Sequence, residues 1–181
     1  MPAYAAFLRA INLGATRKFP QDAIKEAVEA AGGRDVETYI NTGNVLLTTS
    51  LRSRARVEAA LERAFAADRG FEVPTVVLTP AELSRTAADA DELAAETDSL
   101  GMQYVSLLKE APTAEQVREI EAVEYAGERL AVRGRAAHLL LDQPDSYHLS
   151  KLSNAFVEKR LGVATSRNVT VIRALAAKWG S

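Results

Sequence analysis

The sequence predicts an α+β protein in which helices cover one face of antiparallel sheets. Short apolar runs alternate with longer segments whose apolar residues recur every three or four positions, as in strands and amphipathic helices. Two strand-like runs, residues 36–41 and 44–49, are separated only by Thr42 and Gly43, which is short enough for a tight hairpin. With 48% hydrophobic residues, a chain of 181 residues can also fill a real core.

The first half is predicted to contain strand, helix, strand, strand, helix and strand. Pro20 can open the first helix, because proline is tolerated in a first turn, and a Gly-Gly pair can end it. In the second helix, Val57, Leu61 and Phe65 recur at intervals of four. The β-α-β-β-α-β order is that of the ferredoxin-like unit (α/β plait), so residues 1–79 should form a four-stranded antiparallel sheet with two helices on one face. The predicted elements are residues 4–11, 20–31, 36–41, 44–49, 53–68 and 73–79.

The second half predicts a looser copy of this order with extra C-terminal helices. Thr113 is a suitable N-cap for the helix that follows it, and Gly162 can end a later helix. Pattern alone therefore places a ferredoxin-like unit at residues 1–80 and a second, looser one with two C-terminal helices at residues 81–181. The predicted elements are a helix at 80–90, an alanine-rich connection at 88–100, a strand at 102–108, a helix at 112–120, two or three strands in 125–142, and helices at 150–161 and 168–179.

Composition excludes several classes of function. The net charge is −2; residues 1–80 carry 10 basic and 9 acidic side chains, and residues 81–181 carry 12 and 15. Neither half is basic enough for a general nucleic-acid binder, so we expect no strong non-specific nucleic-acid binding. The chain has no cysteine, no apolar run near the roughly 18 residues of a membrane span, and no leader-like N-terminus. We therefore expect a cytoplasmic protein that needs no membrane and no cofactor.

No motif for metal, phosphate-loop or nucleophile chemistry is present. His138 and His148 have no carboxylate or cysteine at ligand spacing, and His138, in an apolar run, should be packed inside the protein. The chain has no P-loop, no G-x-G-x-x-G and no G-x-S-x-G. Most carboxylates, such as Glu115, Glu119 and Glu121, fall on helix faces where solvation is expected. The sequence names no catalytic residue, and enzymatic activity stays open.

Four groups of polar residues at the ends of elements form the candidate site. They are rich in Arg, Lys, Asn, Ser and Thr and contain no acid, so together they would build a donor-rich pocket suited to a phosphate or carboxylate. Arg9 stands out because it lies in an apolar strand, on the same face as Ala5 and Phe7, and a buried arginine needs a partner. The predicted ligand-binding residues are Arg9, Asn12, Asn41, Asn44, Lys151, Arg167 and Asn168.

Each group also has a structural interpretation. Asn41 and Asn44 are favoured turn residues beside Gly43, which supplies a positive φ. Ser150 can cap the helix that follows it, and Thr165, Ser166 or Asn168 can cap the last helix. These interpretations would describe a structural or partner-binding protein. A third class is RNA binding, since RNA-recognition domains share the β-α-β-β-α-β order, but they stack bases on aromatic side chains and the run NVLLTT has none.

Four strings in order along the chain resemble a bacterial family, domain of unknown function 1697. They are FLRAINLG, TYINTGNV, SKLSNAFVEKRLGV and TSRNVT, where the family usually has LLRGINVGG, TYIQSGNVVF, SKLTNAFLERRLGV and TTRNWNT. The resemblance reaches both ends of the chain and implies a two-part α+β protein of ferredoxin-like units with no established activity. The positions that match are Arg9, Asn12, Gly14, Tyr39, Gly43, Asn44, Ser150, Lys151, Asn154, Arg167 and Asn168.

The departures from the family strings bear on the candidate site. Ala10 and Ala15 stand where the family has glycine, which limits how closely a ligand can approach the backbone there. Val169, Thr170 and Val171 stand where Trp-Asn-Thr is usual, which removes a stacking aromatic. We expect a protein that binds a small anionic ligand, phosphate- or carboxylate-bearing, between its two halves without a metal.

Overall fold

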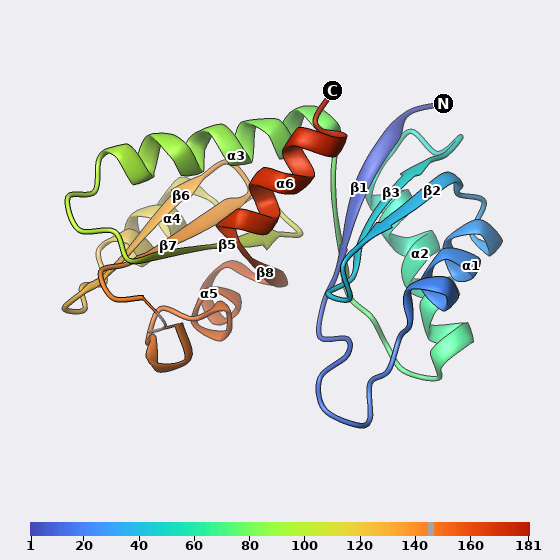
Figure 1. The fold of residues 1–181 in the computed structure, drawn as a ribbon, viewed down its shortest axis with the longest axis horizontal. Coiled ribbons are helices and arrows are strands. Elements are labelled where there is room, and N and C mark those ends of the chain that lie inside the picture. Colours follow the sequence, from blue (N-terminus) through green and yellow to red (C-terminus); the bar gives the residue numbers. More distant parts are fainter. Residues whose placement is uncertain (145–146) are drawn as a thin grey trace. The chain divides into compact units, whose positions relative to one another are not determined.

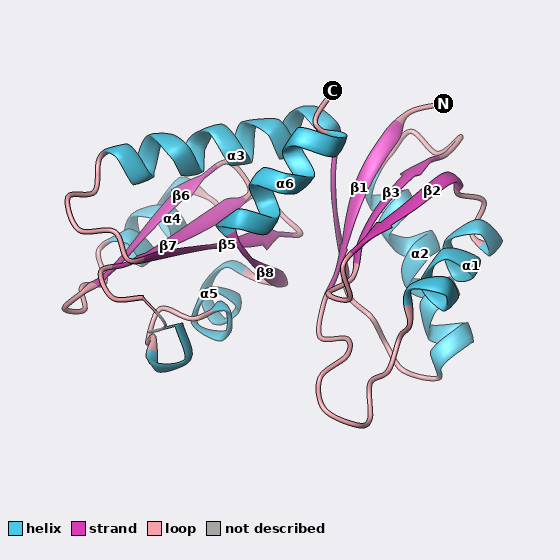
Figure 2. Ribbon diagram, viewed as in Figure 1, coloured by secondary structure: helices cyan, strands magenta, loops and turns pink. Residues whose placement is uncertain are grey.

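The computed structural model describes residues 1–144 and 147–181. It contains two compact units (Figure 1), the first comprising Met1–Leu83 with Trp179–Ser181 and the second comprising Ser84–Lys178. Each unit is built around one four-stranded sheet (Figure 2). The predicted α+β class, with two ferredoxin-like antiparallel sheets and additional C-terminal helix, is confirmed.

The elements of the first unit are β1 (Ala3–Leu8), α1 (Gln21–Ala30), β2 (Arg34–Tyr39), β3 (Asn44–Thr48), α2 (Arg54–Arg69) and β4 (Thr75–Leu78). The strands lie in the order β2-β3-β1-β4, and every neighbouring pair is antiparallel. Ile24 and Val28 of α1 and Leu61 and Phe65 of α2 are buried in one core with the inward side chains of the sheet. Both helices therefore cover the same face, as the sequence predicted.

The elements of the second unit are α3 (Pro80–Ala95), β5 (Met102–Leu108), α4 (Ala114–Glu121), β6 (Glu128–Arg133), β7 (Ala136–Leu141), a 3-10 turn η1 (Tyr147–Leu149), α5 (Asn154–Leu161), β8 (Ala164–Asn168) and α6 (Val169–Trp179). The strand order, β6-β7-β5-β8, repeats that of the first sheet. Helices α4 and α5 bury Ile120 and Val157 against one face. Leu93 of α3 packs on the opposite face, against Ala131 and Leu140, so this sheet is covered on both sides.

Four details differ from the sequence-based predictions. The second unit is a full β-α-β-β-α-β copy, because β8 is a strand where only a loop was predicted. Helix α3 runs on to Ala95 through the predicted connection, and α5 begins at Asn154 instead of residue 150. The hairpin loop has four residues, because the last pair of β2 and β3 is Tyr39 with Asn44.

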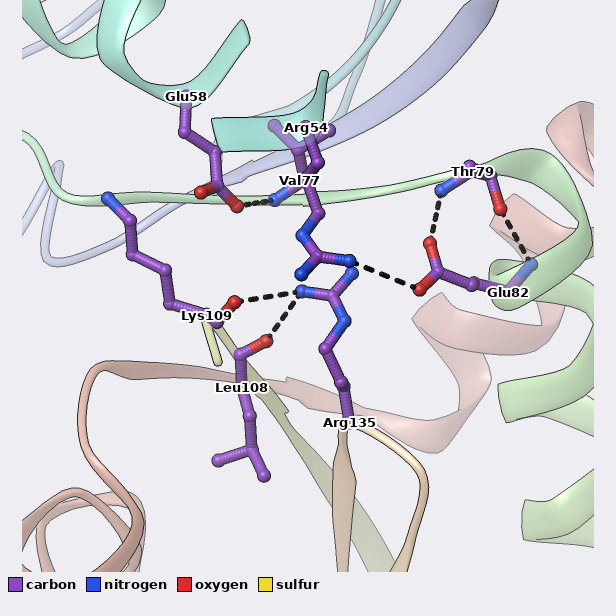
Figure 3. Close-up of polar contacts among 8 residues, drawn as sticks. All are labelled: Arg54, Glu58, Val77, Thr79, Glu82, Leu108, Lys109 and Arg135. Atoms are coloured by element: carbon purple, nitrogen blue, oxygen red, sulfur yellow. Dashed lines mark hydrogen bonds and ion pairs between the residues drawn. The ribbon is translucent and has the colours of Figure 1, made fainter. Parts of the chain in front are cut away.

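Carboxylates of α2 cover the outer edge of β4. The Glu62 Oε1 atom accepts from the Thr75 N–H at 2.8 Å. The Glu58 Oε1 atom accepts from the Val77 N–H at 3.0 Å, as Figure 3 shows. The spacing fits, because side chains four apart on a helix lie above one another while N–H groups two apart on a strand point the same way. These bonds occupy edge donors that would otherwise be open to another strand.

Glutamates also cover edge strands of the second sheet. Glu121 Oε1 accepts from the Val132 N–H of β6 at 2.7 Å, and Glu158 Oε1 accepts from the Ala164 N–H of β8 at 3.1 Å. Glu121, which was expected to be solvated, is exposed and also accepts this strand bond. These carboxylates belong to the packing of helix on sheet.

Two capping boxes fix helix starts. Thr79 Oγ1 accepts from the Glu82 N–H at 3.2 Å, and Glu82 Oε2 accepts from the Thr79 N–H at 2.8 Å, which starts α3 (Figure 3). Thr113 and Gln116 form the same reciprocal pair at the start of α4, which confirms Thr113 as the N-cap. Within the described residues, no helix is long and apolar enough to cross a membrane.

Candidate functional site

In the first unit, the loop after β1 and the β2–β3 hairpin tip meet through Asn12. Its Nδ2 group donates to the Asn41 carbonyl at 2.8 Å and to the Phe19 carbonyl at 3.2 Å, while its Oδ1 atom accepts from the Phe19 N–H at 2.9 Å. Two of the predicted polar groups therefore come together. The Asn12 amide uses its donors and its acceptor to hold the loop against the hairpin tip.

The hairpin tip is fixed by side chain and backbone together. Asn44 is buried and its Nδ2 group donates to the Tyr39 carbonyl and to Thr42 Oγ1, both at 2.9 Å. Gly43 has a φ of +77°, as predicted for this turn. Ile40 has a φ of +48°, which β-branched residues rarely adopt. The tip therefore stores backbone strain that the Asn44 bonds help to offset.

Arg9 lies just beyond β1, which ends at Leu8, so its assignment to the face of a strand was wrong. Its N–H donates to the Pro74 carbonyl at 2.9 Å. Arg17, which the sequence did not single out, secures the same loop through donation to the Ala10 and Glu72 carbonyls, both at 2.6 Å. Ala10 has a φ of +56°, a conformation that glycine adopts more readily than alanine.

In the second unit, Ser150 and Lys151 surround a carboxylate. Glu128 accepts from the Ser150 hydroxyl at 2.8 Å, from the Lys151 N–H at 3.1 Å and from the Leu152 N–H at 3.0 Å. The Lys151 Nζ atom lies 4.9 Å from the centre of the Tyr125 ring. This group was predicted to bind an external anion, and the structure shows it holding an acid of its own chain.

The helix cap in this segment is also reassigned. Ser153 Oγ accepts from the Phe156 N–H and precedes α5 as its N-cap, so the prediction that Ser150 caps the helix was wrong. Asn154 Nδ2 donates to the Ala164 carbonyl at 3.0 Å and ties α5 to β8. The string SKLSNAF therefore specifies a turn, a cap and a strand contact.

The Glu128 carboxylate should stabilise the fold in a pH-dependent way. Burial acts to raise its pKa, but the N–H groups of Leu152 and Lys151, the Ser150 hydroxyl and the Lys151 charge outweigh burial and lower the pKa below its ordinary 4.5. A depressed folded-state pKa gives stability that is present above the unfolded value and lost as the pH falls through the folded one.

Replacing Glu128 with glutamine is expected to lower the free energy of unfolding by about 1.5–3 kcal/mol at pH 7, the range for hydrogen bonds to a charged group. Urea denaturation of both proteins at pH 7 and at successive values below 4.5 measures the difference, which should shrink in acid. Glu124→Gln, at an exposed neighbouring position, is the control and should change little. A difference that grows as the pH falls would contradict this role.

Arg167 lies in β8 and is buried. Its NH1 group donates to Thr165 Oγ1 and to the Ser166 carbonyl, both at 2.8 Å. Burial lowers the pKa of Arg167 to about 10, which still leaves the guanidinium charged at neutral pH. The side chain shares a row of the sheet with His138, because Val105 of β5 pairs with both residues.

His138 is packed inside the second unit, as predicted. Burial lowers the pKa of His138 to about 4, with Asp89 acting in the opposite direction and Arg133 adding to the effect, so the ring is neutral at pH 7. In the described part of the chain, no group of three or more His, Cys, Asp and Glu side chains is arranged to hold a metal ion.

Asn168 stands at the corner where β8 turns directly into α6. Its Oδ1 atom accepts from the Thr170 N–H at 2.9 Å and from the Thr170 hydroxyl at 2.8 Å, so it caps the helix as one interpretation predicted. The first N–H groups of a helix lack partners within it and carry the positive end of its dipole. An anion that approaches this corner therefore meets a favourable field.

A pocket of about 250 Å³ opens at this corner. It is lined by the start of β5 and the first turn of α6, together with Arg173 one turn further on: Leu100, Gly101, Met102, Gln103, Asn168, Val169, Thr170 and Arg173. The Nε and NH2 groups of Arg173 both lie 2.7 Å from Asp91 Oδ1. This Arg173–Asp91 ion pair joins α6 to α3. The other N–H donors of the Arg173 guanidinium group are not bound to Asp91.

Gln103 is the least expected member of this wall. It is only 2% exposed, and its Nε2 group donates to the Ala90 carbonyl of α3 at 3.2 Å. Its Oε1 atom is buried with no hydrogen-bond partner among the described residues. A buried acceptor without a partner costs free energy.

A family model described as "Protein of unknown function (DUF1697)" matches residues 1–138 of the chain. Among solved structures, the chain is similar to the one titled as conserved bacterial protein SP0830 from Streptococcus pneumoniae, with 22% sequence identity and a TM-score of 0.74. That match covers 100% of this chain and 99% of the other, and it shows a shared fold. No curated protein matches the chain.

Proposed function

The chain belongs to the DUF1697 family of proteins of unknown function, and we propose that its second unit binds a small molecule with a phosphate or carboxylate group at the start of α6. The observation that carries this proposal is the pocket in which the first turn of α6, Asn168 and Arg173 share one wall. Helix starts bind anions through unpaired N–H groups and the helix dipole. The guanidinium group of arginine adds positive charge and can donate two parallel hydrogen bonds to a phosphate or a carboxylate.

The volume of the pocket limits the size of the ligand. A space of about 250 Å³ is below the roughly 300–1,000 Å³ of pockets for drug-sized ligands. The ligand should therefore be a small metabolite and not a dinucleotide or a polymer. No acid or base of the pocket wall is placed for proton transfer, so the proposal is binding without a catalytic step.

Of the seven residues singled out in the sequence, Asn168 carries this proposal. Its Oδ1 atom is engaged by Thr170, which leaves the Nδ2 donors for a ligand. A ligand role for the remaining six stays a prediction, as does a site shared by both halves. Those six are Arg9, Asn12, Asn41, Asn44, Lys151 and Arg167.

Inorganic phosphate is expected to raise the melting temperature of the protein, relative to chloride at matched ionic strength. A ligand at 100 times its dissociation constant adds about 2.7 kcal/mol to stability. Arg173→Met should weaken phosphate binding about tenfold or more, because it removes a charged donor. Each variant is compared with its own melting temperature without phosphate.

Two further variants separate binding from folding. Arg118→Met removes an exposed arginine of α4, on the opposite face of the sheet, and should leave phosphate binding unchanged. Asp91→Asn removes the carboxylate that competes for Arg173 and should strengthen phosphate binding although it breaks an ion pair. The proposal would be refuted if phosphate raised the melting temperatures of Arg173→Met and Arg118→Met equally. It would also be refuted if phosphate did not raise the melting temperature of the unmodified protein.

A further inference from the structure

The face of the second sheet that α3 covers holds polar atoms without hydrogen-bond partners. His138 is fully buried there, and among the described residues neither its Nδ1 nor its Nε2 atom has a partner. The same holds for Oε1 of Gln103, which pairs across the sheet with Leu140, two residues from His138 on the same face. The three atoms are inaccessible to water, so solvent does not satisfy them either. Burying such atoms costs free energy, which the closed structure has to offset elsewhere.

Helix α3 is the element that closes this face. Its Ala90 carbonyl accepts from Gln103 Nε2 at 3.2 Å. The neighbouring Asp89 is buried close enough to His138 for its charge to act on the pKa of the ring. Its Oδ1 atom, however, forms an ion pair with Arg85 NH2 of the same helix, at 2.7 Å. Movement of α3 away from the sheet would let water hydrate the three unpaired atoms, so their burial favours an open position of the helix.

An ion pair at the surface helps to hold α3 in place. The Nε and NH2 groups of Arg173 on α6 both lie 2.7 Å from Oδ1 of Asp91 on α3. Arg173 also lines the proposed anion pocket. An anion in that pocket therefore competes with Asp91 for one guanidinium group. When the anion takes Arg173, α3 loses this restraint.

We propose, resting on the anion site above, that α3 is a lid whose opening is linked to occupancy of that site. The Asp91–Arg173 ion pair favours the closed position, and the unpaired atoms under the helix disfavour it. Anion binding draws Arg173 away from Asp91 and shifts the balance towards the open position, in which His138 and Gln103 meet solvent. Because linkage between binding and opening is reciprocal, a change that favours opening also favours the anion.

Hydrogen exchange of the full chain, followed residue by residue by nuclear magnetic resonance, tests this link with inorganic phosphate. Saturating phosphate, compared with chloride at matched ionic strength, should speed exchange of the amides of residues 89–95 about two- to fivefold, as expected for the loss of an exposed ion pair. The slowest amides of the chain, which report global unfolding, should exchange more slowly because phosphate stabilises the protein. Asp91→Asn lacks the ion pair, so its α3 amides should exchange faster without phosphate and gain nothing more from it.

His138→Leu tests the cost of the unpaired atoms without a ligand. Leucine is similar in size and removes both unpaired nitrogen atoms, so the α3 amides should exchange about tenfold more slowly than in the unmodified protein. His148→Leu, at an exposed position, is the matched control and should leave α3 exchange unchanged. Unchanged or faster α3 exchange in His138→Leu would overturn the lid.

The outcomes separate this inference from the anion site. If phosphate raises the melting temperature but slows the α3 amides together with the slowest amides of the chain, the lid is wrong and the anion site stands. If phosphate changes neither the melting temperature nor the exchange, the anion site is wrong and the lid has no ligand to respond to. The phosphate comparison uses the unmodified protein, so a loss of folding in His138→Leu would not remove it.

Discussion

Gly43→Ala is expected to lower the free energy of unfolding by about 2–4 kcal/mol. The alanine would be held in a left-handed backbone conformation, and its methyl group would overpack the neighbouring side chains. Gly43 has a φ of +77°, which disfavours any side chain. A Cβ atom built there would lie 2.7 Å from Leu8 Cβ and 2.8 Å from Ile11 Cδ1. Neither neighbour can withdraw easily, because both side chains are buried in the core of the first unit.

Gly14→Ala is the matched control for the backbone effect alone. Gly14 has a φ of +62°, but nothing lies within 4 Å of a Cβ atom added there. The loss should be only about 1 kcal/mol. Urea denaturation of both variants measures the difference, and equal losses would show that the close packing under Gly43 has no effect on stability.

Glu58→Ala is expected to destabilise the protein by about 2–4 kcal/mol, because it removes a carboxyl acceptor from a strand N–H and leaves a cavity. The Glu58 side chain is 2% exposed and bonds the Val77 N–H at 3.0 Å. Glu58→Gln keeps the size and one acceptor oxygen, so it should lose less. Glu26→Ala, at an exposed position of α1, should change little.

Aggregation gives a second measurement for the same variants. If Glu58 helps to shield the edge of β4, Glu58→Ala should also aggregate faster than Glu58→Gln on mild heating, as followed by light scattering. Equal stability of Glu58→Ala and Glu26→Ala in urea would show that the carboxylate is dispensable.

The fold was largely predictable because both sheets follow local periodicities. Apolar runs and stripes of four-residue spacing located nearly every element, and the β-α-β-β-α-β order then fixed the first sheet. The strand β8 was missed because ATSRN contains no apolar run. It is a strand because it pairs with β5, which is a tertiary effect.

The candidate site was harder to predict, because its members are assembled by strand pairing and helix contacts. Asn168 was found from its place before the last helix, whereas Arg173 reads as an ordinary helix-surface residue. Gln103 did leave a signal, since it is polar in the otherwise apolar start of the run MQYVSLL. Glu128 left none, and its role depends on a backbone turn 22–24 residues away.

Nuclear magnetic resonance with inorganic phosphate tests the central claim most directly. Phosphate added in steps to uniformly ¹⁵N-labelled protein should produce saturable shifts of the Val169, Thr170 and Val171 amides. The same dissociation constant should be obtained from these residues and from the melting shift. Shifts confined to the turn at Ser150 and Lys151 or to the hairpin tip at Asn41, with the α6 amides unchanged, would contradict an anion site at the start of α6.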